Sequence, residues 1–92
     1  MTSNQSTRLK QPEDFRYQLE LTENHLQNPE NHAPYTAYGV RLVHNGAELL
    51  DYKDVDFNQA RLRRYLRLIA ESEVPYYHIN DLIEDYICDR NA

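Results

Sequence analysis

Apolar and polar side chains alternate strictly in the first patterned part of the chain. The apolar residues from Phe15 to Leu21 fall on every second position, and the residues between them are polar. A period of two predicts a half-buried strand. The following segment, 22–34, is mostly polar and contains two prolines. We therefore predict a long polar loop there, with a role in mobility or in contact.

The alternation resumes before Asn45-Gly46, a dipeptide typical of hairpin turns. A two-residue loop at this point would place Asp51 opposite Val40 and bring charge onto the apolar face. A three-residue loop of 44–46 instead pairs Val40 with Leu50. Because a slip of one residue turns every side chain to the other face, the three-residue loop is predicted. The two strands are then expected at about 36–43 and 47–53.

Two amphipathic helices are predicted after the strands. Asp56 followed by Gln59 fits an N-cap with its capping-box partner. Apolar residues then recur at helical spacing over about 57–72, and Val74-Pro75 ends this helix. The second helix begins at Ile79, with apolar residues again spaced by three and four.

The order β-β-β-α-α predicts an α+β fold, in which a three-stranded antiparallel sheet carries two amphipathic helices packed on one face. One domain is expected over 15–90, preceded by a disordered tail of 1–14 that carries few apolar groups. A chain of 92 residues leaves room for no second domain. So small a core favours additional burial against a partner or a second copy.

Composition excludes several classes of protein. One Cys in 92 residues rules out a disulfide framework and a Cys-based zinc module. No stretch approaches the roughly 20 apolar residues of a membrane helix, and the N-terminus lacks the apolar core of a signal peptide. A reduced, cytoplasmic protein that does not enter the membrane is therefore expected.

Several motifs resemble a known family. They are Tyr35-Thr36-Ala37-Tyr38-Gly39-Val40, Asn45-Gly46, Asp54, Pro75 with His78-Ile79, and Asp81-Leu82-Ile83-Glu84-Asp85-Tyr86-Ile87. Over about residues 35–87 the chain resembles a family of short Firmicutes-type bacterial proteins classed as a domain of unknown function. The resemblance implies a small bacterial cytosolic domain and supplies no activity. The sequence Pro75-Tyr76-Tyr77-His78 departs from the family in carrying one additional aromatic residue.

The net charge of −5 hides an uneven distribution. Residues 57–70 contain four arginines and no acidic residue. Three of these arginines, Arg63, Arg64 and Arg67, fall opposite the apolar face of the first helix and form a basic patch. A nucleic-acid surface is one interpretation. The acidic whole chain and the i,i+4 spacing of Arg67 and Glu71 favour a solvated face or a protein contact, so nucleic acid is an unlikely partner.

The second helix carries an acidic patch, which consists of Asp81, Glu84, Asp85 and Asp89. A plain solvated face is the simplest interpretation. The patch is also suited to a basic partner, to mimicry of a nucleic-acid backbone, or to the arginines of a second copy. Adjacent carboxylates can serve as acid and base only where their surroundings separate their pKa values, and an exposed helix face does not.

No catalytic, cofactor-binding or metal-binding residues are predicted. The four histidines lack metal-ligand spacing. Cys88 lies ten residues beyond His78, about 15 Å along one helix, too far for a local dyad. Cys88 is expected to be an inert, partly buried thiol.

Eight tyrosines are the remaining feature of the composition. Five of them, Tyr17, Tyr38, Tyr52, Tyr65 and Tyr86, are expected on core faces. The predicted protein-contact residues lie at element edges and on the outer sheet face: Tyr35, Val43, Leu49, Tyr76 and Tyr77. We therefore expect a non-enzymatic protein–protein interaction or regulatory module, either monomeric or homodimeric. A small acidic inhibitor that mimics nucleic acid, of phage or mobile-element type, is the alternative.

Overall fold

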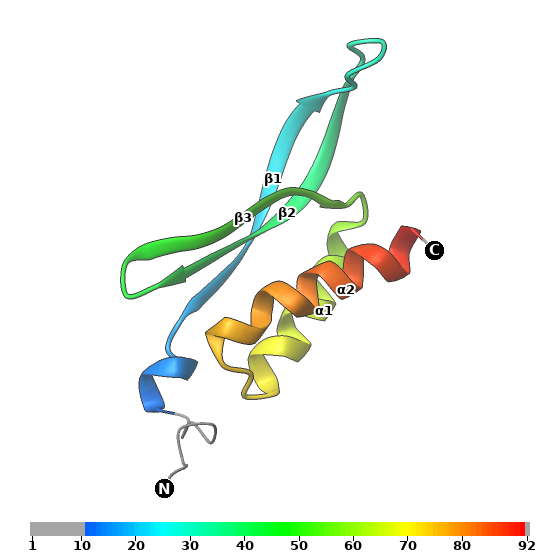
Figure 1. Cartoon of the computed structure of the whole chain (residues 1–92). Helices are drawn as coiled ribbons and strands as arrows, with labels where there is room; N and C mark the ends of the chain where they lie inside the picture. The colour runs from blue at the N-terminus through cyan, green and yellow to red at the C-terminus, as the bar shows by residue number, and fades with distance from the viewer. Residues whose placement is uncertain (1–10, 92) are drawn as a thin grey trace, which may run out of the picture.

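The computed structural model describes residues 11–91 and has the predicted α+β order. Figure 1 shows three antiparallel strands followed by two helices. The short 3-10 helices are η2 (Pro12–Phe15) and η3 (Tyr76–His78). The longer elements are β1 (Gln18–Gln27), β2 (Pro34–His44), β3 (Ala47–Asp56), α1 (Gln59–Glu71) and α2 (Ile79–Asn91).

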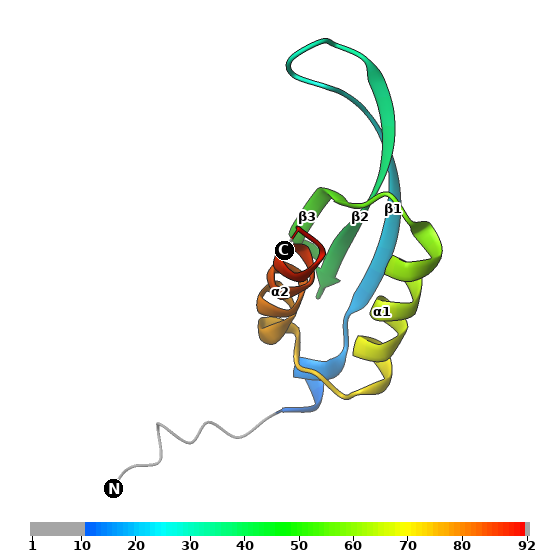
Figure 2. The same cartoon turned by 90° about the vertical axis from the view of Figure 1, so that its right-hand side faces the viewer.

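Both helices pack on one face of the sheet, whose strand order is β1-β2-β3. In Figure 2, α1 lies on the β1 side of this face and α2 on the β3 side. The core fills the space between them because each element turns its apolar stripe inward. Its buried members are Val40, Leu42, Val55, Leu62, Leu66, Ile69, Ile79 and Ile83. The five tyrosines expected on core faces all pack against this core.

The polar segment 22–34 is not a long loop, so that prediction is wrong. β1 continues to Gln27 and pairs with β2 without a register shift, and only 28–33 form the turn. The Asn28 N–H donates to the carbonyl of Ala33 at 2.9 Å and closes the turn. The polar ends of β1 and β2 pair through backbone hydrogen bonds, which do not depend on an alternation of apolar side chains. Figure 1 shows the resulting hairpin arm, which extends well beyond β3.

The turn between β2 and β3 is a two-residue loop, so the predicted three-residue loop is also wrong. Asn45 and Gly46 both have positive φ, 54° and 77°, and His44 pairs directly with Ala47. An extra residue, Leu49, then bulges from β3 and restores the apolar register. The register correction therefore sits inside the strand rather than in the turn.

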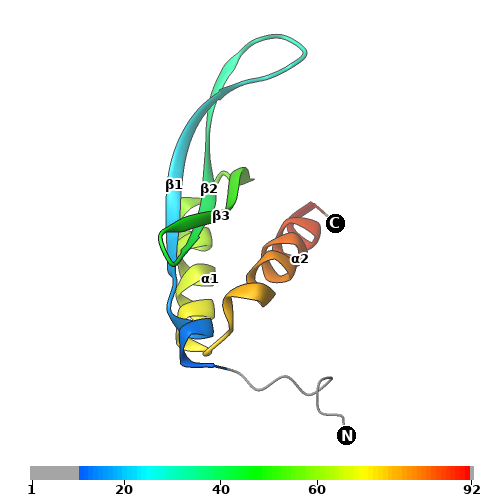
Figure 3. The ribbon, with the colours of Figure 1, turned by 60° about the vertical axis from the view of Figure 1, so that its left-hand side comes forward.

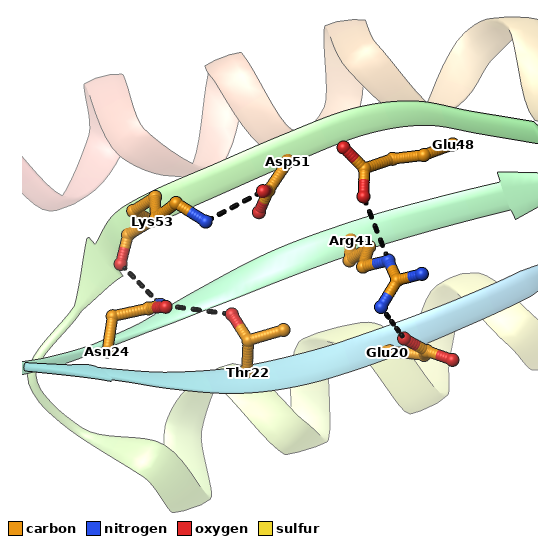
Figure 4. A network of polar contacts seen from close by, with 7 residues as sticks. All are labelled: Glu20, Thr22, Asn24, Arg41, Glu48, Asp51 and Lys53. Carbon is orange, nitrogen blue, oxygen red and sulfur yellow. Dashed lines mark hydrogen bonds and ion pairs between the residues drawn. The ribbon is translucent and has the colours of Figure 1, made fainter.

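A second irregularity in β3 requires Gly39. The register passes from Val40↔Tyr52 to Tyr38↔Asp56, so β3 has two more residues than β2 at this point. A Cβ atom on Gly39 would lie 1.9 Å from the Tyr52 carbonyl oxygen, which no side chain can tolerate. The Asn24 amide crosses this point from β1 and donates to the Lys53 carbonyl at 2.9 Å (Figure 4).

The predicted start of the first helix is also corrected. α1 begins at Gln59, and its N-cap is Asn58, whose side chain accepts the Arg61 N–H at 3.0 Å. Asp56 is not the cap because its carboxylate is occupied by other partners. Asn58 takes the role because its amide oxygen can reach the free N–H groups of the first turn.

The predicted N-terminal tail of 1–14 is ordered in its last part. Residues 1–10 lie outside the described residues. Pro12–Phe15 form η2, and the buried Asp14 carboxylate accepts the Gln11 N–H at 2.9 Å. The Glu13 carbonyl also lies 3.0 Å from Nε2 of His44. The His44 contact joins η2 to the end of β2.

Candidate protein-interaction surface

The basic patch divides between two surfaces of α1. Arg63 and Arg67 lie one helical turn apart and line a groove of about 310 Å³ between α1 and β1, whereas Arg64 does not line it. The apolar part of the groove comes from Leu19 and Leu21 of β1, from Tyr17 directly before β1, and from Leu66 and Ala70 of α1. The groove thus combines apolar walls with two guanidinium groups.

The three arginines of the basic patch carry charge that the described part of the chain does not neutralise. Arg63, Arg64 and Arg67 are exposed, and within residues 11–91 none forms an ion pair. The Arg67–Glu71 pair suggested by the sequence is therefore absent from this structure. Positive charge beside an apolar groove favours a ligand that carries negative charge.

β1 is an edge strand with a regular backbone. It pairs with β2 over ten residues without interruption, and no other strand of residues 11–91 lies on its outer side. The opposite edge, β3, is interrupted by two register shifts. A bulged edge resists pairing with another strand, whereas a regular edge offers a row of free N–H and C=O groups. β1 is therefore the edge that can accept an added strand.

The outer face of the sheet is covered by its own polar contacts. Arg41 on β2 reaches Glu20 at 3.5 Å and Glu48 at 3.0 Å, and so ties all three strands together (Figure 4). Lys53 pairs with Asp51 at 2.7 Å on the same face. These charged side chains make the outer face less suited to an apolar partner than the sequence suggested.

The predicted contact residues do not form one surface. Tyr35 lies in the hairpin arm, where its hydroxyl donates to Asp54 at 3.0 Å. Val43 lies eight residues further along the same strand, about 26 Å away at the usual rise. Leu49 and Tyr77 are exposed, at 45% and 36%.

The side chain of Tyr76, another predicted contact residue, is used within the fold. Its ring stacks on His44 with centroids 4.0 Å apart and an interplanar angle of 17°. Tyr77 packs edge-on against the same ring, with centroids 5.3 Å apart. These aromatic groups therefore join η3 to the end of β2.

The acidic patch lies on the exposed side of α2. Asp81, Glu84, Asp85 and Asp89 are all exposed, and none forms an ion pair within the described residues. Glu84 accepts a hydrogen bond from the Tyr52 hydroxyl at 3.2 Å. That contact raises the pKa of Tyr52, in addition to the larger effect of burial.

A buried charge cluster was missed by the sequence reasoning. The carboxylate of Asp56, fully buried at the end of β3, receives two hydrogen bonds of 2.7 Å from the Arg61 guanidinium. The Tyr86 hydroxyl of α2 donates to the same carboxylate. Arg61 holds the pKa of Asp56 well below its usual range, and Tyr86 assists. The cluster fastens β3, α1 and α2 to one another.

The groups that could support metal or thiol chemistry are dispersed. Among residues 11–91 no group of three or more His, Cys, Asp or Glu side chains could hold a metal ion. Cys88 is exposed, not partly buried as predicted, because its position on α2 faces away from the sheet. No helix in the described part of the chain has the length and apolar character needed to cross a membrane.

Comparisons with protein-family models, with curated proteins and with solved structures each found no match. The resemblance over residues 35–87 therefore stays a prediction.

Proposed function

We propose that this chain is a non-enzymatic protein–protein interaction module whose contact surface is the β1–α1 groove. The observation that carries the proposal is the position of an apolar groove directly beside a regular, unpaired strand edge. An exposed sheet edge beside a groove is a recurring arrangement for binding a protein segment, because backbone hydrogen bonds supply affinity and pockets supply specificity.

Filling the groove provides a direct test. Ala70 is exposed and lines the groove, so Ala70→Trp fills it without removing a core side chain. Ala60 is also an exposed alanine of α1 and does not line the groove, which makes Ala60→Trp the matched control. The wild-type chain and the two variants are each immobilised and incubated with extract of the native cell. We expect the wild type and Ala60→Trp to capture a protein that Ala70→Trp does not capture. Equal capture by all three chains, or no captured protein, would contradict the proposal.

A second candidate function rests on the acidic patch of α2. Because its four carboxylates are exposed and unpaired with any cation in the described residues, the patch can occupy a basic groove as a nucleic-acid mimic would. This candidate predicts capture that Asp81→Lys with Asp85→Lys abolishes and Ala70→Trp leaves intact. The same experiment therefore separates the two functions.

A further inference from the structure

We infer that the β1–α1 groove binds an extended peptide segment of a partner protein, which adds a strand to β1 and carries acidic residues at alternate positions. This inference rests on the proposed function and specifies its ligand. Three features of the chain support it: the free edge of β1, the composition of the groove and the spacing of two arginines.

The free edge determines the backbone conformation of the ligand. The outer side of β1 presents unpaired groups over Gln18–Gln27, and the groove runs beside its first half. A peptide paired with this edge lies over the groove, with every second side chain turned toward α1. Such a peptide satisfies the free N–H and C=O groups of β1, which a helical ligand cannot do.

The composition of the groove determines which side chains enter it. Leu19, Leu21 and Leu66 provide apolar walls, and burial of apolar side chains against them supplies binding energy. Arg63 and Arg67 lie on the α1 side of the same groove and have no acidic partner within residues 11–91. Carboxylates of the ligand are the groups that match these guanidinium ions, which bind carboxylates in a forked geometry.

The spacing of the two arginines fits alternate positions of a strand. Residues four apart in an α-helix are about 6 Å apart along its axis. Side chains on the same face of a strand, two residues apart, are about 6.7 Å apart. Two carboxylates at positions i and i+2 of the added strand can therefore each reach one arginine. Arg64 lies outside the groove and takes no part.

A displayed library of random ten-residue peptides tests this inference. The library is selected on the full chain after depletion on Ala70→Trp. The enriched peptides are then synthesised and titrated against three chains: the wild type, Arg63→Glu with Arg67→Glu, and the control Arg64→Glu. We expect enrichment of Asp or Glu at i and i+2 between apolar residues. Affinity should fall at least tenfold in the double variant and less than twofold in the control.

Several results would overturn the inference. The first is that the selection enriches no peptide, and the second is that the enriched peptides lack the acidic pattern. The third is that Arg64→Glu lowers peptide affinity as much as the double variant does. Tight binding of a single-stranded oligonucleotide that depends on Arg63 and Arg67 would assign the groove to nucleic acid instead. A protein partner captured through the groove, together with any of the three peptide results, would leave the proposed function standing and remove only the acidic strand as its ligand.

Discussion

Arg63 and Arg67 share one groove with the edge strand β1, although both belong to the solvent-facing side of α1. Neither side chain contributes an ion pair to the described fold. Arg64, the residue next to Arg63, lines no part of that groove. Arg64 therefore provides a matched control for the two arginines that line the groove.

Reversal of these two charges should leave the fold intact. Exposed arginines without a partner contribute little to stability, so Arg63→Glu with Arg67→Glu is expected to change the free energy of unfolding by less than about 0.5 kcal/mol. Urea unfolding followed by circular dichroism measures this change. A loss of more than about 1.5 kcal/mol would show that both arginines support the fold and would remove them as ligand-binding residues.

Removal of the buried Asp56 charge should have a much larger effect. The Asp56 carboxylate accepts hydrogen bonds from Arg61, Tyr86 and the Asn58 N–H. Hydrogen bonds to a buried charge contribute about 1.5–3 kcal/mol, so Asp56→Asn is expected to lower the free energy of unfolding by about 3 kcal/mol.

The exposed Asp54, two residues away on β3, provides the control for this substitution. It accepts one hydrogen bond, from Tyr35, so Asp54→Asn should lower the free energy of unfolding by less than about 1 kcal/mol. Urea unfolding of both variants gives the comparison. Equal losses would contradict the central role of Asp56 in joining β3, α1 and α2.

The same cluster predicts how stability depends on pH. The pKa of Asp56 in the folded chain lies well below its ordinary value of 3.8, chiefly because Arg61 donates to it. The stabilisation by this carboxylate is therefore complete above pH 3.8 and is lost as the pH falls toward the folded-state pKa. The difference in unfolding free energy between wild type and Asp56→Asn should therefore decrease steadily as the pH is lowered below 3.8. A constant difference between pH 7 and pH 2.5 would contradict the assignment.

Gly39 should tolerate no side chain, in contrast to Gly46. A Cβ on Gly39 would overlap the Tyr52 carbonyl oxygen, so Gly39→Ala must separate β2 from β3 and is expected to unfold the domain or to destabilise it by more than about 3 kcal/mol. A Cβ on Gly46 meets open space, and only its φ of +77° disfavours Gly46→Ala, by about 1 kcal/mol. Thermal unfolding of both variants compares them, and similar melting temperatures would contradict the described register.

The order of the elements could be predicted because each one carries its own periodicity. The alternation before Leu21 and the helical spacing after Gln59 are local patterns that tertiary packing preserves. The hairpin arm was missed because residues 22–34 are mostly polar, so the sequence shows no apolar face there. The strands of the arm are joined by backbone pairing, which the sequence does not reveal. The bulge at Leu49 was missed for a related reason, since a turn of either length can give the same apolar register.

The candidate site could be predicted only in part. A helical projection places Arg63, Arg64 and Arg67 together, but β1 lies against one side of α1 only and so separates Arg64 from the other two. The role of Asp56 depends on Tyr86, which is 30 residues away in the chain. Asp56 followed by Gln59 fits a helix start, and a short polar motif cannot show that Asn58 becomes the cap while Asp56 becomes the buried partner of Arg61.

The most direct test of this account is amide hydrogen exchange of the full chain, with and without the protein that it captures. The account predicts that bound partner slows exchange most strongly in β1 over Gln18–Glu23, where free edge amides become hydrogen-bonded, and in α1 beside the groove. Slowed exchange confined to α2, to the hairpin arm or to the aromatic groups around Tyr76, with β1 unchanged, would contradict it.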